Sequence, residues 1–355
     1  MISPAEIEAI PKAELHCHLE GGLHLETLWE FSQRNEPGRH DSFDEFKAAV
    51  TVPKGTAPGF KPFLAKFEPL RFHYGTLKDI ERLVFESICE IGIPLRCQEI
   101  RFSPIFFARR IFKDDASSGT VLPLTLVEDV AAAIIQSVHW ATHVICGWEN
   151  VPLILTCDRG FGYAVNKPTL DLLRRPIAQR IGGLDLAGDE SADASEFIRP
   201  FREWKEAGKL ITIHAGEDPN SGGPLKVIEA LDVFKADRIG HGVRAIEDSE
   251  LVARLARECV PLEICPTSNL QTRAVATEAE HPIKRLFDAG CCITINTDDP
   301  IICGTTIEAE YKFASRLGLT AEDLRQCTRN SVEAGVLSDE EKRTLMAQIS
   351  ADERK

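Results

Sequence analysis

Short apolar segments that end in polar or small residues recur along this chain, and this repetition constrains the fold more than any other feature. Eight of them have the length of a buried strand, and stretches with the spacing of an amphipathic helix lie between them. Alternating strand and helix signals predict a parallel sheet with crossover helices. The expected strands span residues 14–19, 97–102, 151–156, 183–187, 210–213, 237–240, 261–265 and 292–296.

Eight strand–helix repeats favour a sheet that closes on itself, so we expect an α/β fold of the (β/α)8 TIM-barrel type. A doubly wound open sheet is the alternative that the strand count leaves open. The crossover over residues 19–97 is long and contains the aromatic stretch FLAKF at residues 63–67. Long ordered insertions often cover active sites, which predicts a helical lid after the first strand. No linker divides the chain, so we expect a single domain, residues 1–355.

The expected helices carry their own local signals. Ser3 with Glu6, and Thr320 with Asp323, have the spacing of capping boxes, which predicts that helices begin there. Apolar and small residues also recur at helical spacing after the aromatic stretch. This stripe comprises Ile80, Leu83, Val84, Ser87, Ile88 and Ile91.

Charge and hydropathy narrow the choice of partners. The formal net charge of −14 opposes binding to a nucleic acid, and no apolar run reaches the roughly 20 residues that cross a bilayer. The first residues carry acids and prolines instead of the basic start and apolar stretch of a signal peptide. We therefore expect a cytoplasmic enzyme whose partner is a small molecule, with neither a nucleic acid nor a membrane as partner. Surface helices of a barrel look alike whether paired or solvated, so the sequence assigns no oligomeric state.

Side chains that bind metal ions fall at the ends of the predicted strands. His16 and His18 are two apart within a strand, so both point to the same side of it. The other candidates each follow a later strand, and barrel enzymes build their sites at these carboxyl ends. One histidine alone is more often structural, whereas a set that ends four different strands indicates a site. The set is His16, His18, His214, His241, Asp298 and Asp299.

Imidazole and carboxylate ligands with one water in the shell suit Zn²⁺, although iron and manganese accept similar ligands. Such an ion would lower the pKa of its water from about 16 towards about 7. Glu217 lies three residues after His214, at the same end of a strand. We interpret it as an acid or proton shuttle whose pKa is raised by enclosure, because it is a poor fifth ligand. In isolation it would indicate only an exposed loop carboxylate.

Six ordered motifs resemble those of the adenosine deaminase family, which contains the adenosine and adenine deaminases of the metal-dependent amidohydrolase superfamily. They are HCHLEGG at residues 16–22, GLDLAGDE at 183–190, TIHAGE at 212–217, RIGHGVRA at 238–245, CPTSNLQT at 265–272 and INTDDP at 295–300. The similarity extends from Pro11 to about Leu337. It implies hydrolytic deamination of adenosine, and of 2′-deoxyadenosine, each to the corresponding inosine or 2′-deoxyinosine and ammonia.

The resemblance also implies which residues hold the metal. The positions that match the zinc ligands of the family are His16, His18, His214 and Asp298. The end of the fourth predicted strand offers no lysine that could be carbamylated as a bridge between two metals. One Zn²⁺ per chain is therefore expected.

Further positions match groups that act on the substrate. By resemblance, His241 orients the attacking water, Glu217 gives a proton to purine N1, and Asp299 holds the attacking oxygen and the purine N7. Gly188 matches a backbone donor to N3. The apolar gate over the substrate matches Phe63, Leu64 and Phe67. The expected catalytic residues are Glu217, His241 and Asp299, and the expected substrate-binding residues are His18, Glu20, Gly188, Asp299, Phe63, Leu64 and Phe67.

Glu20 departs from the family pattern, since adenosine deaminases carry an aspartate there that contacts the ribose 5′-hydroxyl. A glutamate is similar to the adenine deaminases, so adenine, N6-methyl-AMP and aminofutalosine stay open as alternative 6-aminopurine substrates. Two other classes are a metallohydrolase of esters, lactones or amides on the same barrel, and a catalytically inactive binding protein. The complete ligand set opposes the inactive protein.

Overall fold

The computed structural model describes residues 2–71, 73–91, 95–112, 119–147 and 151–352 of the 355. Within these ranges, strands β3 to β9 form one curled parallel sheet of seven strands in chain order, while β1 and β2 form a separate parallel pair. The bounds are β1 Lys12–Glu14, β2 Leu95–Gln98, β3 Ile100–Phe102, β4 Leu153–Asp158, β5 Gly183–Ala187, β6 Leu210–Ala215, β7 Arg238–His241, β8 Pro261–Ile264 and β9 Cys292–Ile295.

The segment that follows β1 lies between the two edges of the seven-stranded sheet. The His18 N–H donates to the Asp298 carbonyl at 2.7 Å, beyond the end of β9, and the Leu19 N–H donates to the Arg101 carbonyl in β3 at 2.8 Å. The strand predicted over residues 14–19 is therefore regular only in β1. Beyond β1 the segment pairs with its neighbours through isolated bridges, one to each edge of the sheet.

The second predicted strand is divided at Glu99. Before this residue β2 pairs with β1, and after it β3 pairs with β4. The Glu99 N–H bonds the Glu14 carbonyl at 2.9 Å, and its buried carboxylate pairs with Arg238 at 2.6 Å. The strand is interrupted because it exchanges neighbours at this point. The remaining six predicted strands are found, with ends shifted by a few residues.

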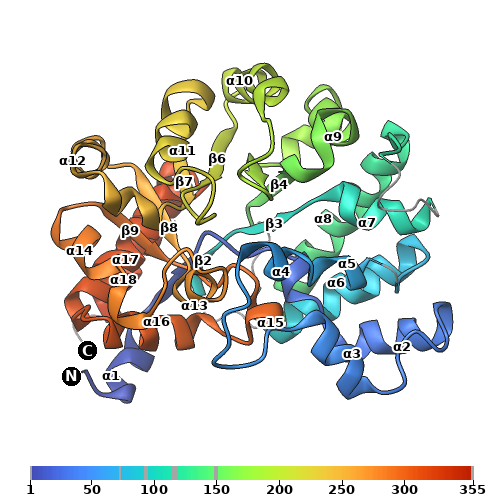
Figure 1. Ribbon diagram of the computed structural model, residues 1–355, viewed down its shortest axis with the longest axis horizontal. Helices are drawn as coiled ribbons and strands as arrows, with labels where there is room; N and C mark the ends of the chain where they lie inside the picture. Colours follow the sequence, from blue (N-terminus) through green and yellow to red (C-terminus); the bar gives the residue numbers. More distant parts are fainter. Residues whose placement is uncertain (1, 72, 92–94, 113–118, 148–150, 353–355) are drawn as a thin grey trace.

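Helices surround the sheet (Figure 1). They are α1 Pro4–Ala9, α2 Leu25–Asn35, α3 Phe43–Val50, α4 Phe60–Leu64, α5 Phe67–Leu70, α6 Leu77–Ile91, α7 Pro104–Ile111, α8 Leu124–Cys146, α9 Gly162–Asp171, α10 Ile198–Glu206, α11 Pro224–Glu229, α12 Ser249–Glu258, α13 Pro266–Gln271, α14 Ile283–Asp288, α15 Pro300–Cys303, α16 Ile307–Arg316, α17 Ala321–Ala334 and α18 Asp339–Asp352.

Local sequence signals explain several of these helices. The predicted capping boxes are formed at α1 by Ser3 and Glu6 and at α17 by Thr320 and Asp323. The predicted apolar stripe of α6 is buried from Ile80 to Ile88, while Ile91 is partly buried and packs against the core. This face packs against α8, which fixes the position of the helix.

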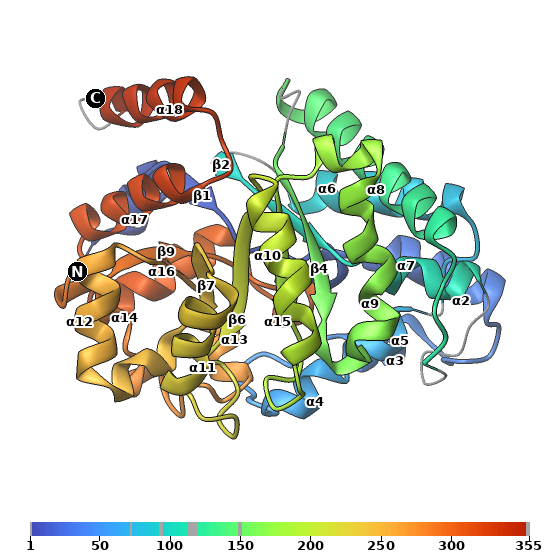
Figure 2. The same cartoon turned by 90° about the horizontal axis from the view of Figure 1, so that it is seen from above.

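The two ends of the sheet are covered differently. At the amino ends of the strands, α17 and α18 pack on β1 and β2 around a small separate core that contains Leu15, Val332 and Ile349. In Figure 2 the arrowhead of β4 points away from α18 and towards α4. The insertion between β1 and β2 supplies α2 to α6, of which α4 and α5 reach the carboxyl ends of the strands.

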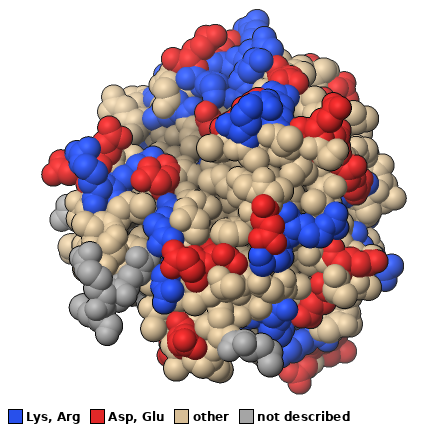
Figure 3. All heavy atoms as spheres, turned by 90° about the vertical axis from the view of Figure 1, so that its left-hand side faces the viewer, with Lys and Arg blue, Asp and Glu red and all other residues tan. Residues whose placement is uncertain are grey.

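The outer surface is polar and mixed in charge. On the face shown in Figure 3, basic and acidic side chains lie next to one another. Arg254, for example, pairs with Asp232 at 2.7 Å and with Glu258 at 3.1 Å. Among the described residues, none of the helices combines the length and hydropathy that a membrane crossing requires.

Candidate active site

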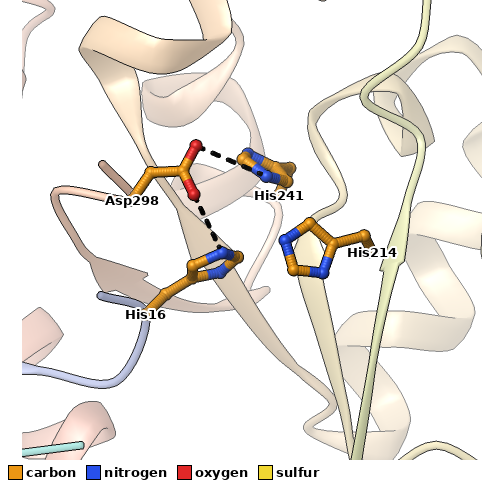
Figure 4. A group of neighbouring side chains, drawn as sticks. All are labelled: His16, His214, His241 and Asp298. Atoms are coloured by element: carbon orange, nitrogen blue, oxygen red, sulfur yellow. Dashed lines mark ion pairs between the residues drawn. The ribbon is translucent and has the colours of Figure 1, made fainter. Parts of the chain in front are cut away.

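Imidazole and carboxylate groups from four distant parts of the chain converge at the carboxyl ends of the strands (Figure 4). The potential ligand atoms of His16, His214, His241 and Asp298 all lie within 4.8 Å of one another. Asp298 contacts His16 at 3.2 Å and His241 at 3.9 Å. All four side chains are buried, so the cluster is shielded from bulk water.

His18 joins the same cluster, although its ligand atom is not within that distance of every other member. Its Nε2 lies 3.1 Å from His16 Nε2, 3.2 Å from His214 Nε2 and 3.7 Å from Asp298 Oδ1. The four predicted metal ligands are therefore brought together, and His241 lies among them.

Two buried carboxylates determine which imidazole nitrogens face the cluster. His16 Nδ1 lies 3.1 Å from Glu263, and His214 Nδ1 lies 3.0 Å from Asp185. A proton on each Nδ1 leaves the Nε2 lone pairs of both rings directed at one another. Such an arrangement repels unless a cation lies between the nitrogens, and carboxylates behind ligating histidines are typical of metal sites. The donor set thus fits a divalent metal that accepts nitrogen and oxygen ligands.

Strand ends and backbone strain position these groups. His16 and His18 lie beyond β1, His214 is in β6, and His241 ends β7. His241 and Asp298 have φ of 60° and 66°, in the left-handed region that ordinary residues avoid. This turn at each strand end directs the side chain into the cluster.

Glu217 faces His241 from the loop after β6. Its Oε2 lies 3.3 Å from His241 Nε2. Burial, together with the nearby carboxylates of Asp298 and Glu190, raises the pKa of Glu217 well above its usual value. This raised pKa favours the protonated form, as a general acid requires.

Glu190, which is not among the site residues predicted from the sequence, fixes the position of the Glu217 loop. The buried Glu190 carboxylate accepts hydrogen bonds from the N–H groups of Gly216, Glu217 and Asp218, at 3.0, 2.7 and 3.1 Å. Three consecutive amides bound to one carboxylate hold the loop rigid. Its place within the motif at residues 183–190 was the only sequence signal for this role.

Asn269 orients the ring of His241. Its side-chain amide lies 2.9 Å from His241 Nδ1. With the amide nitrogen donating, Nδ1 is the acceptor and Nε2 carries the ring proton. Burial lowers the pKa of His241 well below its usual value, so the ring is neutral. A neutral imidazole with its N–H directed into the site is a hydrogen-bond donor to a reacting oxygen.

Asp299 lies beside the cluster with one carboxylate oxygen unpaired. Asp299 Oδ1 is buried and has no hydrogen-bond partner among the described residues. Burial and the neighbouring acids Asp298 and Glu20 raise the pKa of Asp299 well above its usual value. A Cβ at Gly21 would overlap this carboxylate, so glycine is required there. A protonated carboxyl with a free oxygen suits binding of a polar substrate atom.

A cavity of about 270 Å³ opens from this cluster. Its wall contains the predicted substrate-binding residues His18, Glu20, Phe63, Leu64, Phe67, Gly188 and Asp299, together with His214, Glu217, His241 and Asp298. His16 is fully buried beneath it. Gly188 has φ of 83°, and a Cβ there would overlap Asp158, so the wall is open at this residue only because it is glycine.

Glu20 lies in the cavity wall, and only one of its two carboxylate oxygens accepts a hydrogen bond from the described residues. Its Oε1 accepts the Ser103 N–H, while the buried Oε2 has no partner among the described residues. Burial raises the pKa of Glu20 to about 8. Arg71, Ser103, Phe106 and Phe161 continue the wall beyond Glu20, and the sequence analysis assigned none of these four residues to a site.

Comparisons of the sequence agree with one family over nearly the whole chain. A protein-family model described as Adenosine deaminase matches residues 11–352. The adenosine deaminase of Shewanella loihica is 32% identical over 344 residues, covering 96% of this chain and 98% of that protein. The adenosine deaminase of Salmonella schwarzengrund is 34% identical over 346 residues, with the same coverage.

Solved structures with the same fold include an adenine deaminase from Arthrobacter aurescens. Its TM-score is 0.82 at 24% identity, and the match covers 98% of this chain and all of that one. An amidohydrolase from Burkholderia ambifaria with bound Zn has a TM-score of 0.83 at 23% identity, covering 99% of this chain and 93% of that one. At these identities the likeness shows the fold.

Proposed function

Because the chain belongs to the adenosine deaminase family, we propose that it is a zinc-dependent hydrolase that converts adenosine, and 2′-deoxyadenosine, to the inosine nucleoside and ammonia. The observation that carries this function is the arrangement of the site. A buried cluster of metal-ligand type and two carboxyl groups with raised pKa values, Glu217 and Asp299, face one cavity.

His16, His18, His214 and Asp298 would hold one Zn²⁺ per chain, with His241 beside it. The ion would supply Lewis-acid activation of a water molecule, lowering its pKa from about 16 to about 7. Glu263 and Asp185 keep the Nε2 lone pairs of His16 and His214 available for this role.

Glu217 acts as the general acid. Attack at C6 of the purine interrupts the aromatic ring and places charge on N1. The proton that burial keeps on Glu217 neutralises this charge during the attack, and one positioned proton donor contributes about 10²–10⁴ in rate. Glu190 holds the loop so that the carboxyl stays at this position.

His241 and Asp299 orient the reacting groups. The Nε2–H of His241 donates to the attacking oxygen as negative charge develops there. Asp299 contacts the same oxygen, and its carboxyl proton suits the N7 acceptor of the purine. The backbone N–H of Gly188 donates to N3. These contacts fix the base with C6 towards the metal ligands.

The insertion after the first strand acts as a lid on a closed (β/α)8 barrel that forms one domain. The segment after β1 bonds both edges of the seven-stranded sheet, which supports closure. Phe63, Leu64 and Phe67 in the cavity wall support the lid, since an apolar cover excludes water and strengthens the polar contacts beneath. The small-molecule partner, the exclusion of nucleic acid and membrane partners, and the cytoplasmic location stay predictions.

Adenine deamination is the second candidate, favoured by Glu20 at the position of the family's aspartate. Metal-loaded protein is assayed with adenosine, 2′-deoxyadenosine, adenine, AMP and aminofutalosine by the loss of the 6-aminopurine absorbance. We expect adenosine to have the highest kcat/KM. A preference for adenine of about tenfold or more would contradict the nucleoside while leaving the mechanism intact, and no ammonia from any compound would contradict the enzyme.

A further inference from the structure

The wall of the cavity also contains a cationic side chain, Arg71, to which the proposed reaction gives no role. Arg71 follows α5 and lines the same cavity as Glu217 and Asp299. Its charge influences Glu20, and the charge of Glu20 in turn influences Asp299. Glu20 lines the same cavity, and its Oε2 is buried without a hydrogen-bond partner among the described residues.

Aromatic rings hold the guanidinium without using its hydrogen-bonding capacity. The Cζ of Arg71 lies 5.1 Å from the centroid of the Phe106 ring and 4.6 Å from that of Phe161. Rings at these distances attract the cation and restrict its position. Phe106 is buried in α7, and Phe161 is partly buried after β4, so two separate elements fix the group.

Arg71 has spare donors. The buried Nε has no hydrogen-bond partner, and the guanidinium makes neither a hydrogen bond nor an ion pair with any of the residues that the structure describes. The acids whose charges act on Arg71 include Asp158, Glu68 and Glu20. Of these, Glu20 accepts the Ser103 N–H and Asp158 accepts the Gly160 N–H at 2.8 Å. A buried guanidinium nitrogen without an acceptor is costly, which indicates that a ligand supplies one.

We propose that Arg71 forms an oxyanion subsite that binds a phosphate or carboxylate on the sugar of a 6-aminopurine nucleoside. This inference rests on the proposed function, because the base must first lie at the metal end of the cavity. The planar guanidinium matches the paired oxygens of both groups, and a charge-assisted contact of this kind is strong. The subsite extends the substrate class from adenosine to anionic adenosine derivatives.

Binding of product-type ligands tests the subsite without turnover. Calorimetry on zinc-loaded protein gives the Kd of inosine, inosine 5′-monophosphate and inosine 5′-carboxylate. We expect at least one of the two anions to bind about tenfold or more tightly than inosine, as a hydrogen-bonded charge pair allows. The derivative that gains affinity identifies the source of the oxyanion.

Variants show whether Arg71 causes the gain. The affinity ratio is the Kd of inosine divided by the Kd of the tighter-binding anion. Arg71→Gln is expected to reduce this ratio to about one. Arg71→Lys keeps the charge but not the paired N–H groups, so it is expected to retain part of the gain in affinity. The matched control is Lys61→Gln, which removes a charge of the same sign from an exposed side chain 3.8 Å from Asp189 at the cavity wall. Its ratio should equal that of the wild type.

Two results would overturn the subsite. One is wild-type protein that binds neither anion more tightly than inosine, and the other is an unchanged ratio in Arg71→Gln. Deamination of adenosine by the same zinc-loaded wild type is measured in parallel. Its absence would contradict the proposed function, whereas the Arg71-dependent ratio of Kd values concerns the subsite alone.

Discussion

At the scale of single residues, protonation separates the roles of similar side chains. Glu217 and Asp299 are buried beside other acids, which raises the pKa of each and favours its protonated form. Asp298 is buried as well, but it lies among the proposed metal ligands, and a ligating carboxylate is ionised. Asp298 is thus ionised as a ligand, whereas Glu217 and Asp299 can donate a proton. Surroundings that move the pKa values of similar groups apart in this way determine which group acts as acid and which as base in an active site.

Replacement of Glu217 tests the general acid. Glu217→Gln should lower kcat for adenosine by about 100-fold or more, because the amide cannot deliver a proton to N1. Zinc content, measured by elemental analysis, should stay at the wild-type level. Glu247→Gln, on an exposed carboxylate paired with Arg244, should keep full activity. Undiminished deamination by Glu217→Gln would exclude this role, and would favour a hydrolase of esters or lactones, which needs no acid facing a ring nitrogen.

At the scale of elements, most of the site residues stand at the carboxyl end of a strand or in the loop that follows it. The elements behind them are also held by buried polar contacts. In α16, the buried Glu310 accepts the Thr267 N–H at the start of α13, at 3.0 Å, and the Thr305 hydroxyl. Burial nevertheless raises the pKa of Glu310 to about 7. This group ties α16 to α13 and makes the packing sensitive to pH.

The pH dependence of stability tests this contact. The folded state raises the pKa of Glu310 above the unfolded value of 4.5, so its contribution to stability is complete below about pH 4.5 and is lost as the pH rises through 7. Glu310→Gln stays neutral and should gain stability relative to the wild type between pH 5 and 8.5, by about 3 kcal/mol at most. The free energy of unfolding of Glu310→Gln and of the wild type is measured by urea unfolding at pH 5 and at pH 8.5.

A control on the same helix distinguishes burial from charge alone. Glu308 is only partly buried and pairs with Lys312, which lowers its pKa. Glu308→Gln should show no gain in relative stability as the pH rises. The metal ligands are the same in the wild type, Glu310→Gln and Glu308→Gln. Their titration therefore contributes equally to the stability of all three proteins and does not affect the comparison. Parallel stability curves for Glu310→Gln and wild type would show that Glu310 does not titrate in this window.

At the scale of the whole molecule, a metal would join parts of the chain that are otherwise connected only through the sheet. The ligands come from the segment after β1, from β6 and from the loop after β9, which are separated by about 200 and 80 residues of sequence. The first of these segments also bonds both edges of the sheet. An ion at this point would stabilise the closure of the fold as well as the site.

Metal removal tests this link. A ligand that binds only the folded state stabilises it by about 4 kcal/mol when its free concentration is about a thousandfold above Kd. Stripping with a chelator should therefore lower Tm and abolish deamination, and added Zn²⁺ should restore both. Calorimetric scans before and after dialysis measure the change. Equal Tm values together with unchanged turnover would contradict a metal at this cluster.

The sequence alone determined the parallel order of the strands and which side chains meet at their carboxyl ends. Apolar runs and helical spacing depend on local burial, and the ends of parallel strands necessarily lie at one edge of the sheet. This rule led to the prediction that His16, His18, His214, His241, Asp298 and Asp299 lie together, and the structure places His16, His214, His241 and Asp298 within 4.8 Å of one another, while the roles of these residues stay predictions. The family was likewise evident from six ordered motifs and is confirmed by the family model.

Only the tertiary structure decided what surrounds these residues. Glu263, Asp185 and Asn269 face the site histidines from other strands and loops. Asp185 and Asn269 lie within two of the ordered motifs, but the motifs do not say which histidine each side chain contacts. Arg71 lies in the long insertion, whose path over the cavity depends on packing between elements far apart in the chain. Protonation states follow from burial and from neighbouring charges, and both are properties of three-dimensional packing. Local sequence specifies which groups are available, whereas the fold decides their partners.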